Sequence, residues 1–277
     1  NLVGNYILLF GHFGAPQMGV QGAALATVIS RFVELAIVAL WVHLHPDQNP
    51  YIRGVYRSFR IPAHLLKSII RKGMPLLANE FFWASGMAMM NQCYSTCGLD
   101  VVPAQNIAST MWSLASVAFL SLGNSVGIMM GQMLGAGSEK EEVRSSNRQL
   151  ITVAVLSGLV FGIAMAAFSG IFPLLYNTDD GVRLLATRMI LISALMMPFN
   201  SYTNAAYFTL RSGGQTMVTF LFDSFYVCGL VASSAYLLTF LGISILPLYF
   251  ITHFMDLGKC IIESHLLAPP FLLACIP

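Results

Sequence analysis

The sequence predicts an all-α integral membrane protein. Of its 277 residues, 56% are hydrophobic and 9% are charged, whereas about a quarter of the residues in a typical soluble domain are charged. The mean hydropathy is +0.71. Long uncharged runs recur along the chain, and each reaches the roughly 20 residues that one helix needs to cross a bilayer. No stretch alternates apolar and polar residues as membrane β-strands do.

We expect eight helical spans, because glycine, proline or charged residues interrupt the apolar runs at regular intervals. The first span is clipped by the start of the sequence, which we interpret as a truncation rather than a signal peptide. A polar, basic connector separates the second span from the third and marks a boundary between two bundles. The predicted spans are 1–10, 20–43, 68–96, 103–135, 148–175, 183–210, 215–240 and 243–266.

Basic residues gather in every second loop, which predicts the orientation of the chain. The connector and the start of the next helix contain Arg53, Arg57, Arg60, Lys67, Arg71 and Lys72. Loop 135–148 and the turn after Leu210 are also basic, whereas loops 11–19, 98–103 and 241–245 contain neither Lys nor Arg. Because cytoplasmic loops are rich in Lys and Arg, we expect the connector and the C-terminus to lie in the cytoplasm and the protein to reside in the plasma membrane.

A short internal repeat supports this topology. Residues 30–35 (SRFVEL) match residues 252–257 (THFMDL), and both segments lie on spans that run in the same direction. The repeat therefore predicts that residues 1–44 are the last third of a unit equivalent to 67–266. On this hypothesis, about four further helices precede the sequence.

One acidic side chain stands out inside an apolar helix. The segment Gly73–Tyr94 has membrane length and contains Glu80. A charge at that depth is costly, so such residues usually face a bundle interior or a watery cavity. Trp83, Met87 and Asn91 follow on the same side of the helix. We consider two interpretations for Glu80: an ion-coupling or cation-binding role beside an aromatic pocket, and a buried structural carboxyl.

A second acid, Asp223, lies in the predicted span 215–240. It is expected either to hydrogen-bond to Asn200, Tyr202 or Asn204 on the preceding span, or to take part in ion coupling. Asn200 and Asn204 are four residues apart, on one helix face. We expect both amides to line a cavity and to hydrogen-bond across helices.

Charged neighbours three residues apart are expected to pair within their own helices. Arg31 and Glu34 form one such pair, and Asp256 lies at this spacing from both His253 and Lys259. We interpret both groups as structural, because self-pairing reduces the cost of placing charge in a membrane.

Three segments together resemble the multidrug and toxic compound extrusion (MATE) transporters. They are NLVGNYILLFG…GAPQMGVQGAALATVISR at 1–31, GQMLGAGSEKEE at 131–142 and LRSGGQT at 210–216. The resemblance implies twelve helices in two six-helix lobes around a central cavity. Residues 1–44 would then be the last two helices of the N-terminal lobe, 45–66 the cytoplasmic connector, 67–266 the complete C-terminal lobe and 267–277 a tail.

The resemblance also implies a function. Transporters of this family export amphipathic, often cationic organic compounds by alternating access, in exchange for H⁺ or Na⁺, with no other cofactor. We accordingly expect small-molecule substrates, the lipid bilayer as the surroundings, a monomer, and a bacterial inner-membrane location.

Two acids of the sodium-coupled family pattern are not reproduced here. The pattern has an acid eight residues after a proline, but counting from Pro75 reaches Trp83, and the acid is Glu80, one turn earlier. The second acid corresponds to Asn200, so Asp223 becomes the candidate for a second carboxylate. Any bound Na⁺ is expected near Glu80.

Other classes of function lack support in the sequence. There is no basic tail for nucleic acid, no GxxxxGK[ST] loop for ATP, and no hydrolase motif at helix spacing, so we predict that the protein is not an enzyme. The cysteines are interpreted as packing residues; they are Cys93, Cys97, Cys228, Cys260 and Cys275. Two alternatives to an exporter stay open: a flippase for a lipid-linked saccharide, and a membrane scaffold that does not transport.

Overall fold

The structure is a computed structural model of the chain, and it describes residues 1–49, 52, 62–214 and 216–267. Predictions that concern Arg53, Arg57 and Arg60, Gln215 in the third MATE-like segment, and the tail from 268 onward lie outside these residues. Within the described residues, regular structure is helical throughout.

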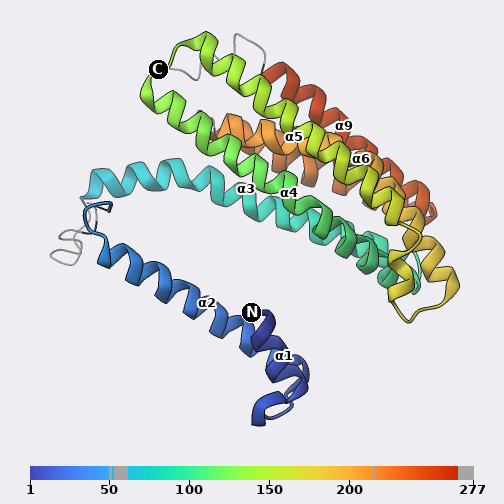
Figure 1. Cartoon of the computed structure of the whole chain (residues 1–277). Helices are drawn as coiled ribbons and strands as arrows, with labels where there is room; N and C mark the ends of the chain where they lie inside the picture. The colour runs from blue at the N-terminus through green and yellow to red at the C-terminus, as the bar shows by residue number, and fades with distance from the viewer. Residues whose placement is uncertain (50–51, 53–61, 215, 268–277) are drawn as a thin grey trace. The chain divides into compact units, whose positions relative to one another are not determined.

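Figure 1 shows the helices in chain order. They are α1 (Leu2–Phe10), η1 (His12–Gly14), α2 (Gly19–Leu44), α3 (Ala63–Thr96), α4 (Val101–Ala136), α5 (Lys140–Phe168), η4 (Phe172–Leu175), α6 (Asp180–Ser212), α7 (Thr216–Phe220), η5 (Leu221–Phe225), η6 (Val227–Ala232), α8 (Ser233–Phe240) and α9 (Ile245–Leu266).

Six of the described helices are long and apolar enough to cross a membrane. They are α2, α4, α5, α6, the continuous segment Met217–Phe240 and α9. Helix α1 has only 9 residues. Helix α3, with 34 residues, is long enough but is not among the six, because polar residues in its middle lower its hydropathy. The predicted span 148–175 is wrong at its end: α5 stops at Phe168 and a 3₁₀ turn, η4, follows.

The chain divides into two compact units, residues 1–66 and 67–277. In the first unit α1 packs on α2, and the approach is close because Gly22 has no side chain. A Cβ atom at Gly22 would lie 2.5 Å from the carbonyl oxygen of Leu8. The second unit begins within α3, which itself starts slightly earlier, at Ala63.

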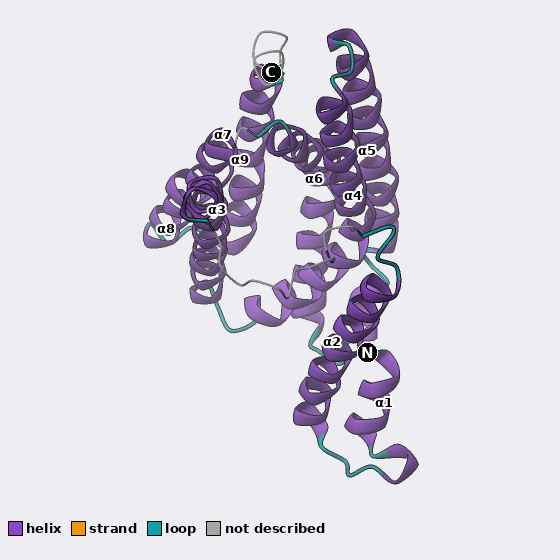
Figure 2. Cartoon of the chain, turned by 90° about the vertical axis from the view of Figure 1, so that its left-hand side faces the viewer, coloured by secondary structure: helices purple, strands orange, loops and turns teal. Residues whose placement is uncertain are grey.

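In the second unit, α6 packs against both α4 and α5, and these three helices lie side by side in Figure 2. Glycines allow the close approach. Gly123 and Gly127 of α4 face Asn204 and Phe208 of α6. Spacing of small residues by four is the common device for helix contacts in membranes, where lipid removes most of the hydrophobic drive for helix association.

A second pair of glycines, Gly158 and Gly162, repeats this spacing on α5. A Cβ at Gly158 would lie 2.6 Å from Cβ of Ser201, and one at Gly162 would lie 2.8 Å from the carbonyl oxygen of Ala194. Both neighbours belong to α6, so the two helix backbones are nearly in contact.

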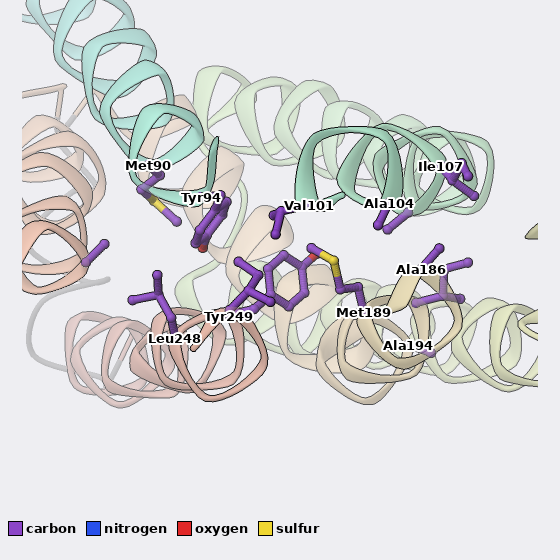
Figure 3. Close-up of a cluster of buried hydrophobic side chains, with 14 of the residues drawn as sticks. Met90, Tyr94, Val101, Ala104, Ile107, Ala186, Met189, Ala194, Leu248 and Tyr249 are labelled. Atoms are coloured by element: carbon purple, nitrogen blue, oxygen red, sulfur yellow. The ribbon is translucent and has the colours of Figure 1, made fainter. Parts of the chain in front are cut away.

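The core joins α3, α4, α6 and α9, which all contribute side chains to the cluster in Figure 3, and it also includes residues of α5, η6 and α8. Figure 3 labels Met90 and Tyr94 from α3, Val101, Ala104 and Ile107 from α4, Ala186, Met189 and Ala194 from α6, and Leu248 and Tyr249 from α9. Two buried hydrogen bonds cross this core. The hydroxyls of Tyr94 and Thr252 are 2.6 Å apart, and those of Ser193 and Tyr249 are 2.8 Å apart.

The segment 216–240 is one continuous helical run that contains two π-helical stretches, η5 and η6. π-Helical turns are rare and frequently occur at functional sites. Asp223 lies within η5.

We predict that Gly158→Ala lowers the melting midpoint of the purified protein in detergent by several degrees. The added Cβ meets Cβ of Ser201, which moves only if the helix moves, and overpacking of this kind costs about 1–3 kcal/mol. The matched control is Gly135→Ala in α4, because a Cβ there meets nothing within 4 Å. Both changes raise helix propensity by about 1 kcal/mol. A Gly158→Ala protein that melts at or above the wild-type midpoint would contradict the packing described here.

Candidate functional site

Glu80 lies on an exposed side of α3. Trp83 is 44% exposed, Met87 is 37% exposed, and Asn91, also exposed, accepts a hydrogen bond of 2.6 Å from Nε2 of Gln105. These four residues of the predicted pocket therefore share a surface rather than the interior of their own bundle. The interpretation of Glu80 as a buried structural carboxyl is not supported.

The neighbouring Asn79 is the polar residue that α3 turns inward. Its side chain is 3% exposed. Its Nδ2 donates to the hydroxyl of Tyr207 at 3.2 Å and to Oδ2 of Asp223 at 3.3 Å. The hydroxyl of Ser224 donates to its backbone and side-chain oxygens, at 2.6 and 2.8 Å. Asn79 therefore connects α3 to α6 and η5.

Sequence reasoning missed Asn79, although a signal was present. Asn79, Gly86 and Cys93 recur every seven residues, which places them on one face of a helix, and this is the face that the structure buries. A polar residue in such a row of small residues is a candidate for a buried hydrogen bond.

Asp223 forms an ion pair with Lys259 of α9. Their side chains are 13% and 10% exposed, respectively. The prediction that Asp223 bonds to Asn200, Tyr202 or Asn204 is wrong, because η5 directs it toward α3 and α9 instead. The prediction that Lys259 pairs with Asp256 within its own helix is also wrong. A nearly buried ammonium group is stabilised most by a carboxylate that meets it directly, and in this bundle that carboxylate is Asp223.

The predicted pair of Arg31 and Glu34 is confirmed, with 2.7 Å between the side-chain nitrogen and oxygen. Both side chains are largely exposed, 76% and 62%. A pair of this kind contributes little to stability, in contrast to the ion pair between Asp223 and Lys259.

Helix α9 also contributes a buried carboxyl, Glu263, near the ion pair between Asp223 and Lys259. Glu263 is completely buried, and neither of its side-chain oxygens has a hydrogen-bond partner. Asp256, Lys259 and Glu263 lie at spacings of three and four residues, so they share one helix face. Sequence analysis did not consider Glu263, although this spacing was readable from the sequence.

The two asparagines expected to line a cavity make other contacts. Nδ2 of Asn200 donates to the carbonyl of Met196 in its own helix, at 3.1 Å. The amide oxygen of Asn204 is buried without a hydrogen-bond partner, and it lies against Gly123 of α4. The amide of Asn200 thus forms a hydrogen bond within its own helix. The amide of Asn204 packs at the contact between α4 and α6.

The site is therefore a largely buried polar cluster formed by α3, η5 and α9, which α6 contacts through Tyr207. We call it the C-terminal ion cluster: Asn79, Asp223, Asp256, Lys259 and Glu263. At its margin, Nη1 of Arg211 donates to the hydroxyl of Tyr207 at 3.3 Å. Ionisable side chains inside membrane bundles usually mark ion or substrate pathways, so this cluster is a candidate for proton or cation handling.

Comparisons with known proteins agree with the motifs in the sequence. The sequence profile of the MatE family matches residues 75–237. Multidrug resistance protein MdtK of Edwardsiella ictaluri (strain 93-146) is 31% identical over 243 residues, which cover 83% of this chain and 50% of that protein. The chain thus spans about half the length of this curated relative.

Two solved structures share the fold. A MATE protein in complex with MaL6 aligns over 99% of this chain and 60% of its own, with a TM-score of 0.82 and 16% identity. An outward-facing multidrug resistance MATE family transporter aligns over the same shares, with a TM-score of 0.83 and 18% identity. Because the family profile matches more than half of the sequence and the fold is that of solved MATE structures, this chain belongs to the MATE family.

Proposed function

We propose that the chain is part of a secondary-active multidrug exporter. It would move amphipathic, often cationic organic compounds out of the cytoplasm across the plasma membrane, in exchange for H⁺ or Na⁺, by alternating access of two lobes. The observation that carries this proposal is the ion pair between Asp223 and Lys259, held between helices of a MATE fold. Intramembrane charges are costly and typically functional.

The names of the similar proteins support a role in multidrug export. MdtK is named a multidrug resistance protein, and one structural neighbour is a multidrug resistance transporter. Residues 1–44 would be the last two helices of the N-terminal lobe and residues 67–266 the C-terminal lobe, joined by the cytoplasmic connector 45–66. We further propose that the C-terminus is cytoplasmic and that the transporter works as a monomer.

Glu80 and its exposed neighbours would form part of the substrate surface, and Glu80 would also bind the coupling ion. A carboxylate beside Trp83 and the deformable side chain of Met87 suits flat organic cations, because aromatic rings and carboxylates both attract positive charge. The exposure of these side chains supports this role. Asn204 is left out of the substrate surface, because its amide oxygen packs against α4.

The flippase alternative receives less support. A pyrophosphate headgroup requires several available cations, but Arg31 of α2 and Lys259 of α9 each pair with a carboxylate. The scaffold alternative predicts no transport at all, and the efflux measurement below decides it.

We predict that Glu80→Gln in the full-length transporter reduces efflux of ethidium from cells at least tenfold, and removes its dependence on pH and Na⁺. The substitution removes the charge but keeps the shape. Efflux is followed by ethidium fluorescence across a pH and sodium series. The control is Glu34→Gln, the same chemical change at an exposed pair whose loss has little energetic effect.

Normal, gradient-dependent efflux in the Glu80→Gln protein would remove Glu80 from the coupling mechanism. Absence of ethidium efflux from wild-type cells, with normal surface expression, would favour the scaffold or flippase alternatives.

We also predict that Lys259→Met lowers the melting midpoint in detergent strongly, because breaking a buried ion pair from one side costs about 3–5 kcal/mol. The double variant Lys259→Met with Asp223→Asn recovers most of the loss, since no unpaired charge is left. Arg31→Met at the exposed pair is the control and should change the midpoint little. A double variant that melts as low as Lys259→Met would show that charge neutralisation is not what Lys259 provides.

A further inference from the structure

Glu263 is a buried carboxyl that has no role in the exporter proposed above. Its side chain is completely enclosed, and both carboxyl oxygens lack a hydrogen-bond partner. An ionised carboxylate in that state loses its hydration and gains nothing in exchange, which costs several kcal/mol. The same group is tolerated if it holds a proton, because the neutral acid has no charge to solvate.

An ionised Glu263 would add to an excess of negative charge around it. Six groups interact with it. Asp256, Lys259 and Cys260 belong to α9, Tyr202 and Thr203 to α6, and Asp223 to η5. Among these groups Lys259 alone is a cation, against two carboxyls, or three when Glu263 itself is counted. Its ammonium group donates to Oδ1 of Asp223, so that charge is already used.

The hydroxyl of Thr203 is near enough to interact with the Glu263 carboxyl, although without the geometry of a full hydrogen bond, and it also pairs with the sulfur of Cys260 at 3.2 Å. A neutral hydroxyl does not cancel the charge of an ionised carboxylate. Proton binding is the remaining way to neutralise this side chain.

Lys259 is placed to serve two carboxylates. Glu263 is four residues further along α9, and side chains at that spacing meet on a helix surface. Asp223 lies opposite, on η5. Rotation about the side-chain bonds of Lys259 would move its ammonium group from Asp223 to Glu263 without movement of the backbone.

We propose that Glu263 is a proton-binding site of the C-terminal ion cluster, and that Lys259 moves from Asp223 to Glu263 when this proton leaves. The inference deepens the proposed exporter and rests on it for the role in transport. An organic cation that pairs with Asp223 displaces Lys259, which then neutralises the Glu263 carboxylate as its proton departs. One positive charge enters and one proton leaves, so the charge of the cluster is unchanged.

The accessibility of the two carboxyls fits this order of events. The side chain of Asp223 is 13% exposed, whereas Glu263 is completely buried. A cation therefore reaches Asp223 first. The hydroxyl of Tyr207 accepts a hydrogen bond from the Asn79 amide that also donates to Asp223, so an aromatic side chain lies beside this carboxylate.

The experiment is an infrared pH titration of the full-length transporter in lipid vesicles, following the carbonyl band of protonated carboxylic acids. We expect wild-type protein to show such a band at neutral pH, and Glu263→Gln to lose it. Asp223→Asn should also reduce the band at neutral pH severalfold, because Lys259 is then free to neutralise an ionised Glu263. Asp256→Asn, a matched amide substitution on the same helix face, should retain the component assigned to Glu263.

A second readout uses tetraphenylphosphonium as the organic cation and a pH-sensitive dye in weakly buffered solution. Addition of the cation to wild-type protein should release protons, and Glu263→Gln should release at least fivefold fewer. An unchanged carboxylic acid band in Glu263→Gln, or unchanged proton release, would overturn the inference.

The two proposals can fail separately. Ethidium efflux that follows the ion gradient, together with a band that survives Glu263→Gln, leaves the exporter standing and overturns the proton site. A band that disappears in Glu263→Gln and decreases in Asp223→Asn, in a protein that moves no ethidium, supports the proton site and overturns the exporter.

Discussion

A charge inside an apolar helical bundle must be neutralised within that bundle, because no bulk water is available to hydrate it. The ion pair between Asp223 and Lys259 meets this constraint, and much of the surrounding arrangement depends on it. The amide of Asn79 supports Asp223 from α3, and the hydroxyl of Ser224 fixes Asn79 in turn. Through these contacts, the charged pair and the polar groups around it connect α3, η5 and α9.

The remaining helices are joined by a different interaction. Lipid is as apolar as a leucine side chain, so hydrophobicity alone does not hold membrane helices together, and close packing takes its place. Gly123 and Gly127 on α4, and Gly158 and Gly162 on α5, bring these helices against α6. Helix α6 thus has a tightly packed side toward its two neighbours and, at Tyr207, a polar contact with the ion cluster. This arrangement gives a closely packed part of the bundle beside a part that contains π-helical turns and ionisable groups.

Glu80 and the C-terminal ion cluster are neighbours along α3 but differ in character. Asn79 turns into the bundle and Glu80 turns outward, since adjacent helical residues are about 100° apart. One helix therefore contributes both to an exposed acidic and aromatic surface and to the enclosed charges behind it. This proximity gives a physical route by which a cation at the surface would influence the protonation of a buried carboxyl, through Asn79 and Asp223.

The sequence by itself determined the helical membrane architecture, the bounds of most helices and the family, because these follow from local composition, helical period and motifs. It also determined the pair of Arg31 and Glu34, whose partners are neighbours on one helix. Only the tertiary structure decided that Lys259 pairs with Asp223 rather than Asp256, that Asn79 is buried while Glu80 is exposed, and that Glu263 is enclosed without a partner. These facts depend on which faces of distant helices meet. Local sequence spacing cannot specify such contacts, because the rotation of each helix is fixed by glycine contacts and buried polar groups contributed by other helices.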